Sequence, residues 1–192
     1  MKNSKKSTIF GMGGRDTRSL YKWALAMAPG GCAVEIGSYL GNSAAAIVAA
    51  IQQVDKYSQA VGHLYCVDTW HNDGMTEEPR DTFGEFTKNT KPWRSHITPL
   101  RGWSTEVAQT FEHDIDFLLI DGDHSYEGCR QDIIDWFPKV RLGGICVFHD
   151  YPNAPGVVRS TDELFESGAV AFREVTPILL RCVKIQEMGE GK

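Results

Sequence analysis

The chain has 192 residues, 42% of them hydrophobic and 23% charged, and a formal net charge of −5. These values are ordinary for a soluble globular protein and predict a single domain over residues 1–192. Lys and Arg are scattered, and no run reaches the roughly 18 apolar residues of a membrane span, so we expect neither a nucleic-acid nor a membrane partner. No secretory signal opens the chain, and we expect a cytoplasmic protein.

Helical and strand-like patterns alternate along the chain. Apolar residues at helical spacing predict helices over 15–28, 42–54, 104–111, 125–137 and 156–166. Short apolar runs predict strands at 33–36, 63–67, 97–100, 115–120, 144–148, 169–175 and 178–185. The polar stretch 71–96 is expected to hold one helix and loops, and we hypothesise that it forms part of a substrate lid.

The five cysteines form no C-x-x-C pair. Most lie in apolar, strand-like runs, so we interpret them as small buried side chains in a reducing compartment. A zinc site is not expected from them. They are Cys32, Cys66, Cys129, Cys146 and Cys182.

The first predicted strand leads through Gly37 and Gly41 into the helix at 42–54. Strand, glycine turn and helix bring backbone N–H groups and a helix N-terminus up to a ligand. Glycine tolerates positive φ there and has no Cβ to block close approach. An ordinary strand-to-helix turn without a ligand is the alternative. The turn is not the dinucleotide fingerprint G-x-G-x-x-G, because position 39 is tyrosine.

The second predicted strand is followed by Asp68. An acidic side chain at this place commonly holds a ribose, because a carboxylate can accept from both vicinal hydroxyls. Trp70 lies two residues further on, where its indole could pack on an adenine or could equally belong to the core.

Ionisable residues follow the fourth and fifth predicted strands. Asp121 and His124 come after the fourth, and His149 and Asp150 after the fifth. If these strands are adjacent, the two carboxylates lie side by side and repel unless a cation lies between them. Hard oxygen ligands suit Mg²⁺ or another hard divalent ion. The alternative is that one Asp caps a helix while the other meets solvent.

The stretch Glu35-Ile-Gly-Ser-Tyr-Leu-Gly-Asn-Ser43 resembles Glu-x-Gly-x-Tyr-x-Gly-x-Ser of the catechol-type, metal-dependent O-methyltransferases, which are class I S-adenosylmethionine-dependent methyltransferases. The stretch Asp121-Gly-Asp-His124 is similar to one in metal-dependent methyltransferases that act on sugar hydroxyls of natural products. The longer stretches 120–128 and 143–151 resemble a broad branch of such methyltransferases. The resemblance runs over about residues 31–185. It implies a Rossmann-like α/β fold with a seven-stranded, mostly parallel sheet, helices on both faces and an antiparallel strand from the C-terminal hairpin, with a core at about 31–186.

The resemblance also implies the site. The cofactor would be S-adenosylmethionine, and the metal would be Mg²⁺ or another hard divalent cation held by Asp121 and Asp150. The position of the family's third metal ligand, an Asn, is Tyr151 here, which leaves that ligand open. The expected cofactor-binding residues are Glu35, Gly37, Ser38, Tyr39, Gly41, Ser43, Asp68, Trp70, Gly102, Ser104 and Asp121.

His124 occupies the position of the family's general base, a Lys, and resembles the His thought to be the base in the sugar branch. A His near its normal pKa can take a proton at neutral pH. The alternative is a structural His hydrogen-bonded to Asp123. For His149 the sequence leaves three roles open: metal ligand, support of a ligand, and packing.

Together these features predict an S-adenosylmethionine-dependent, divalent-cation-assisted O-methyltransferase that acts on a small hydroxylated acceptor. Two alternatives remain: a non-catalytic ligand-binding module on the same fold, and an NAD(P)-dependent oxidoreductase, which would need the missing middle glycine. The sequence names neither the acceptor nor the oligomeric state, and a homo-oligomer stays open.

Overall fold

The structure is a computed structural model that describes residues 14–72 and 79–188. Its strands are β1 (Cys32–Ile36), β2 (His63–Asp68), β3 (Ile97–Arg101), β4 (Ile115–Ile120), β5 (Val140–His149), β6 (Val170–Val175) and β7 (Leu179–Lys184). Its helices are α1 (Gly14–Ala24), α2 (Asn42–Asp55), α3 (Phe83–Thr90), α4 (Ser104–Thr110), α5 (Tyr126–Trp136) and α6 (Pro155–Glu166), with short 3₁₀ helices η1 (Lys91–Trp93) and η2 (Phe137–Lys139).

The strands form one sheet in the order β3-β2-β1-β4-β5-β7-β6. The pairs from β3 across to β5 are parallel, and β7 is antiparallel to both β5 and β6. This confirms the predicted seven-stranded, Rossmann-like fold. The strand order reverses between β1 and β4, and sheets of this kind bind ligands at the carboxyl ends of the strands beside that reversal.

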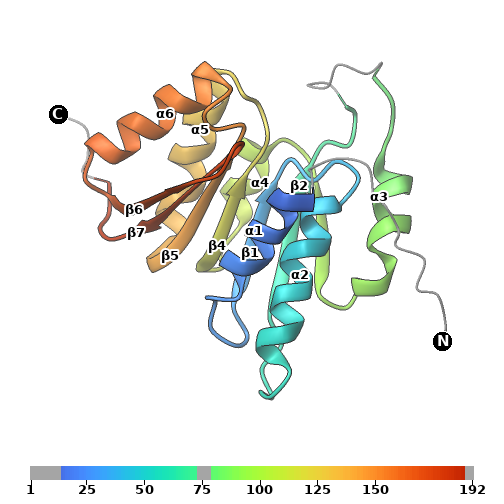
Figure 1. The fold of residues 1–192 in the computed structure, drawn as a ribbon. Coiled ribbons are helices and arrows are strands. Elements are labelled where there is room, and N and C mark those ends of the chain that lie inside the picture. The colour runs from blue at the N-terminus through green and yellow to red at the C-terminus, as the bar shows by residue number, and fades with distance from the viewer. Residues whose placement is uncertain (1–13, 73–78, 189–192) are drawn as a thin grey trace.

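Two hydrophobic cores lie on opposite faces of the sheet. Leu20 of α1, Ile47 of α2 and Phe86 of α3 belong to one core. Ala108 of α4 and Ile133 of α5 belong to the other, together with α6. Helices therefore cover both faces, as predicted, and Figure 1 shows α1 and α2 together on the near side of the sheet.

Two element boundaries differ from the sequence prediction by more than one residue. The first helix ends at Ala24 and not at residue 28, because Ala26 and Met27 donate to carbonyls three residues back and form turns. Strand β5 begins at Val140 and not at residue 144, because Val140 pairs with Ile115 ahead of a register shift. The spacing of apolar residues in the sequence gives no signal for either the turns or the irregular strand pairing.

All five cysteines are free, and four of them are buried. This agrees with their interpretation as small buried side chains. No helix within residues 14–72 and 79–188 has the length and apolar character needed to cross a membrane.

The central strand β1 buries a carboxyl group. Glu35 is fully buried, and burial raises the pKa of this carboxyl to about 7. The nearby Ser43 and Ser38 hydroxyls lower the pKa again, but by less than burial raises it. The Glu35 carboxyl therefore retains its proton at pH values where an exposed glutamate has lost it.

The turn after β1 lies directly against the loop after β4. Gly37 has a φ of 83°, and a Cβ built on it would lie 2.0 Å from the backbone oxygen of Asp121. The Asp121 N–H in turn donates to the Ile36 carbonyl at 2.9 Å. A side chain at position 37 would therefore separate these two loops.

We predict that Gly37→Ala destabilises the fold far more than Gly143→Ala. Gly143 also has a positive φ, of 81°, but a Cβ there meets nothing within 4 Å. The control should cost only the left-handed backbone strain of about 1–2 kcal/mol, and Gly37→Ala should add the clash. Urea unfolding of the two variants measures the difference, and equal losses would contradict the close approach.

We predict that Glu35→Gln becomes more stable relative to the wild type as the pH rises. Because the folded-state pKa is about 7 and the pKa of an exposed glutamate is 4.5, the stability linked to the Glu35 proton is fully present below pH 4.5 and is lost as the pH rises through 7. The relative change between pH 4 and pH 8 should be about 3 kcal/mol. Urea unfolding at both pH values tests this, and a pH-independent difference between the two proteins would refute it.

Candidate active site

The loops that follow β1, β2, β3 and β4 are tied together by backbone hydrogen bonds. The Gly37 N–H donates to the Val67 carbonyl at 2.9 Å, and the Gly102 N–H donates to the Asp68 carbonyl at 3.0 Å. With the contact between Gly37 and Asp121, the carboxyl ends of these four strands form one edge. The predicted cofactor residues are therefore brought together.

Asp68 joins the turn after β1 to the loop after β2. Its Oδ2 accepts from the Tyr39 N–H at 2.8 Å, and its Oδ1 accepts from the Trp70 N–H at 2.6 Å. Each carboxylate oxygen has a further lone pair. The side chain is half-buried, so a diol at this edge of the sheet could still donate to it.

Trp70 lies in the core, which corrects its expected contact with adenine. The residue is fully buried, and its indole packs against Phe83 and Phe86. Its Nε1 donates to the Tyr39 carbonyl at 3.0 Å. Because the indole has no exposed face, it supports the glycine turn through its hydrogen bond to Tyr39 and does not contact a ligand.

Two buried polar atoms beside the glycine turn have no hydrogen-bond partner within the described part of the chain: Oε1 of Glu35 and Oγ of Ser38. Ser43 is buried nearby, at the start of α2. Unpartnered buried polar atoms are rare in folded proteins and call for an explanation such as a ligand.

Ser104 donates to a residue that the sequence analysis missed. Its Oγ lies 2.5 Å from Oδ1 of Asp132, a buried residue of α5. Burial raises the pKa of Asp132 to about 6, although the Ser104 hydroxyl acts in the opposite direction. The sequence signal was an acidic residue beside Cys129 and Ile133 on the buried face of a predicted helix.

Four side chains form a closed ring at the ends of β4 and β5. Asp121 Oδ1 lies 3.3 Å from His124 Nε2 and 2.9 Å from His149 Nδ1. Asp150 Oδ2 lies 3.2 Å from His124 Nδ1 and 3.4 Å from His149 Nδ1. The expected juxtaposition of the two carboxylates is present, with two imidazoles between them.

The ring changes the titration of both histidines. Hydrogen bonding to Asp121 raises the pKa of His124, with further help from the Asp150 charge. For His149, burial lowers the pKa, but Asp121, Asp150 and Asp16 together outweigh it and the net direction is upward. Both imidazoles are thus held by carboxylates.

Asp123 takes no part in the ring. It accepts hydrogen bonds from the Ser125 N–H at 2.8 Å and from the Ser125 hydroxyl at 2.9 Å. The alternative that pairs His124 with Asp123 is therefore not the arrangement observed, since His124 faces Asp121 and Asp150.

The donor atoms at this edge fit a divalent cation. Asp121, His124 and His149 present ligand atoms that all lie within 4.8 Å of one another. Asp150 contacts both imidazoles of this set. Tyr151 does not join them, because it is buried and its hydroxyl accepts from Arg173.

Backbone strain gathers at the same edge. Five non-glycine residues in the described ranges have positive φ, and four of them follow β1, β2 or β5. Such conformations cost of order 1–3 kcal/mol each and cluster at ligand sites. These four are Tyr39, Trp70, Asn72 and Asp150.

Helix α3 packs against the glycine turn. Asn89 donates to the Leu40 carbonyl at 3.0 Å, and Thr90 and Phe86 lie where a Cβ on Gly41 would be. Part of the hypothesised lid, residues 73–78, lies outside the described residues, so the lid stays a prediction.

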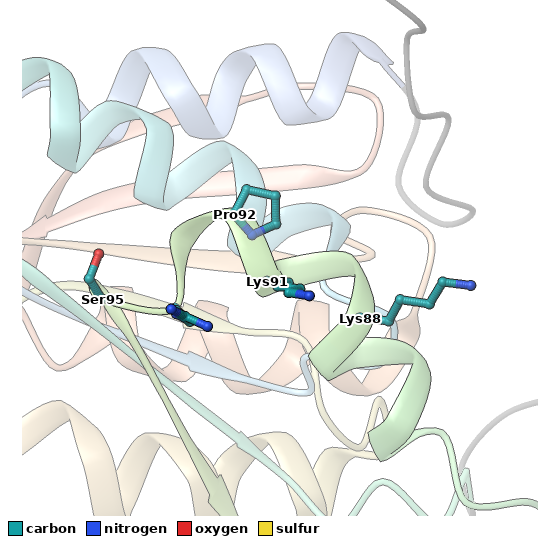
Figure 2. Close-up of a pocket in the computed structure, with 5 residues that line it drawn as sticks. Lys88, Lys91, Pro92 and Ser95 are labelled. Atoms are coloured by element: carbon teal, nitrogen blue, oxygen red, sulfur yellow. The ribbon is translucent and has the colours of Figure 1, made fainter.

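A basic hollow on α3 and η1 lies away from this edge. Figure 2 shows its lining residues, Lys88, Lys91, Pro92, Arg94 and Ser95. The last of these come just before β3, at the amino end of that strand. Arg94 and Ser95 therefore lie at the amino ends of the strands, whereas Asp121 and Asp150 lie at the carboxyl ends.

Residues 34–151 match the family model of a methyltransferase domain, Methyltransf_24. Two curated relatives are similar over part of the chain. Protein y4gI of Sinorhizobium fredii is 27% identical over 61% of this chain, and protein R132 of Acanthamoeba polyphaga mimivirus is 28% identical over 62%. The matched regions span 13% and 51% of those two proteins.

Among solved structures, the chain resembles the O-methyltransferase TomG of Streptomyces achromogenes in complex with SAM. The TM-score is 0.68 at 13% identity, with 91% of this chain and 82% of TomG covered. At this identity the likeness shows a shared fold. Since the family model spans β1 to the end of β5 and includes both Asp121 and Asp150, the chain belongs to the methyltransferase-domain family and carries the class I methyltransferase fold.

Proposed function

We propose that the chain is an S-adenosylmethionine-dependent O-methyltransferase that acts, with a divalent cation, on a small hydroxylated acceptor. The observation that carries this proposal is the ring of Asp121, His124, Asp150 and His149 beside the glycine turn. The family match and a solved neighbour that binds SAM support the choice of methyl donor.

The glycine turn and Asp68 suit the two ends of S-adenosylmethionine. Asp68 would accept hydrogen bonds from the ribose hydroxyls. Within residues 14–72 and 79–188, the buried atoms Oε1 of Glu35 and Oγ of Ser38 have no well-oriented hydrogen-bond partner, although the Ser38 hydroxyl lowers the pKa of Glu35. They suit the amino and carboxylate groups of the methionine part.

Asp121 and Asp150 would hold the cation, and His124 would take the proton of the acceptor. A bound divalent ion lowers the pKa of a hydroxyl whose oxygen it contacts. His124 is the more exposed of the two histidines, with 40% of its side chain accessible against 14% for His149, so it can reach an acceptor that enters from solvent. The acceptor oxygen then bonds to the methyl carbon as the sulfur–carbon bond breaks, leaving S-adenosylhomocysteine.

Binding of the methyl donor tests the role proposed for Asp68. Calorimetry should detect S-adenosylmethionine binding, and Asp68→Ala should weaken it by about tenfold because the ribose hydroxyls lose a charged acceptor. Asp135→Ala is the matched control, since Asp135 lies on α5 and accepts from Gln131 of the same helix. Unchanged affinity in Asp68→Ala, or tight NADH binding without S-adenosylmethionine binding, would overturn the assignment.

The rate of methyl transfer tests His124 as the general base. With an acceptor found in a panel of alcohols, phenols and sugars, His124→Ala should lower kcat about 100-fold, because the base is lost, while S-adenosylmethionine affinity stays near that of the wild type. A near-wild-type rate would rule out His124 as the base. Donor binding with no transfer to any member of the panel would favour a non-catalytic module.

Metal removal and the loss of one carboxylate both test the dependence of activity on a divalent cation. EDTA should abolish activity, and Mg²⁺ or Mn²⁺ should restore it. Asp150→Ala should lose activity that added metal does not restore, because one carboxylate of the site is gone. Full activity in EDTA and in Asp150→Ala would end the cation hypothesis.

A further inference from the structure

We propose that His149 is the third protein ligand of the cation, through its Nδ1, alongside Asp121 and Asp150. This inference deepens the proposed function and rests on its cation site. The sequence pattern of the related enzymes would place the third ligand at position 151. Tyr151 makes other contacts. It is buried, its hydroxyl accepts a hydrogen bond from Arg173, and the Arg173 guanidinium lies over its ring.

The distances around His149 match those between neighbouring ligands of one ion. Its Nδ1 lies 2.9 Å from Asp121 Oδ1 and 3.4 Å from Asp150 Oδ2. Metal–ligand bonds of about 2.1 Å place adjacent ligand atoms about 3.0 Å apart in an octahedron and about 3.4 Å apart in a tetrahedron. His124 also offers a ligand atom to this set, but it contacts the two carboxylate oxygens through two different ring nitrogens. His149 contacts both oxygens through one atom, Nδ1, at the spacing of a coordination shell.

These short contacts are poorly oriented for hydrogen bonds, although Asp121 still raises the pKa of His149. Nδ1 and Nε2 of His149 are both buried and have no hydrogen-bond partner with acceptable geometry among the residues that the structure describes. A buried imidazole without hydrogen bonds costs free energy unless something else satisfies it. A bound cation would give the lone pair of Nδ1 a partner.

A second buried carboxylate acts electrostatically on His149. Asp16, in the first turn of α1, is 8% exposed, and its charge acts on His149. Its Oδ1 also has no hydrogen-bond partner within the described ranges. Metal-ligating histidines usually donate their other ring N–H to such a carboxylate, which fixes the orientation of the ring.

The two histidines of the ring therefore have different proposed roles, His149 as a metal ligand and His124 as the general base. His149 is the buried one and needs to reach only the ion, whereas His124 is 40% exposed and can meet the acceptor. An imidazole ligand also alters metal preference, because imidazole suits Fe²⁺, Ni²⁺ and Zn²⁺, and to a lesser degree Co²⁺, whereas Mg²⁺ prefers oxygen ligands. The site should favour a transition metal over the Mg²⁺ that the sequence resemblance implies.

The experiment measures metal binding by the whole chain without donor or acceptor, so it does not depend on turnover. Co²⁺ is titrated into wild type, His149→Ala, His149→Asn and His124→Ala, with calorimetry and the visible d–d absorption as readouts, and Mg²⁺ is titrated in parallel. The wild type should bind Co²⁺ at least tenfold more tightly than Mg²⁺. His149→Ala should weaken Co²⁺ binding by tenfold or more and change the absorption bands, while His124→Ala keeps both.

His149→Asn keeps a donor near the Nδ1 position but makes it a hard oxygen. It should retain Mg²⁺ binding and lose the preference for Co²⁺, and its thermal unfolding shows whether the fold survives. Wild-type Co²⁺ affinity and spectrum in both His149 variants, or their loss in His124→Ala instead, would overturn the assignment. Cation-dependent turnover that survives in the His149 variants would leave the proposed function standing and refute only this ligand.

Discussion

The site depends on a glycine that lets two loops touch. A Cβ at Gly37 would lie 2.0 Å from the Asp121 backbone oxygen, so only a residue without a side chain allows the turn after β1 to rest on the loop after β4. This contact fixes how closely the backbone of Asp121 lies to the turn after β1. Because Asp121 contacts both His124 and His149, the position of the whole ring follows from it.

The ring itself is a balance of opposite charges. Two carboxylates at the ends of adjacent parallel strands would repel in a half-buried place. Each histidine contacts both of them, and its pKa is raised in return. A divalent cation between the carboxylates would take the place of the histidine protons in the same balance of charge.

The sequence predicted the parts of this account that depend on local chemistry. Buried strands are short apolar runs, and Asp68, Asp121 and Asp150 were placed correctly because each directly follows such a run. The orientation of Trp70 could not be predicted, since it depends on Phe83 and Phe86 of a helix that follows a polar stretch. The effect of Asp16 on His149 could not be predicted either. Asp16 lies more than a hundred residues before His149 in the sequence, and its charge acts on His149 only in the folded chain.

The central claim is that the donor and the cation share one cleft at the carboxyl ends of β1, β2, β4 and β5. A crystal structure with S-adenosylhomocysteine and Mn²⁺, using the anomalous signal of manganese, tests it most directly. The account predicts the nucleoside on Asp68 and the turn at 37–41, with the manganese peak between Asp121, Asp150 and His149. A manganese peak at another surface, or a nucleoside bound away from the glycine turn, would contradict it.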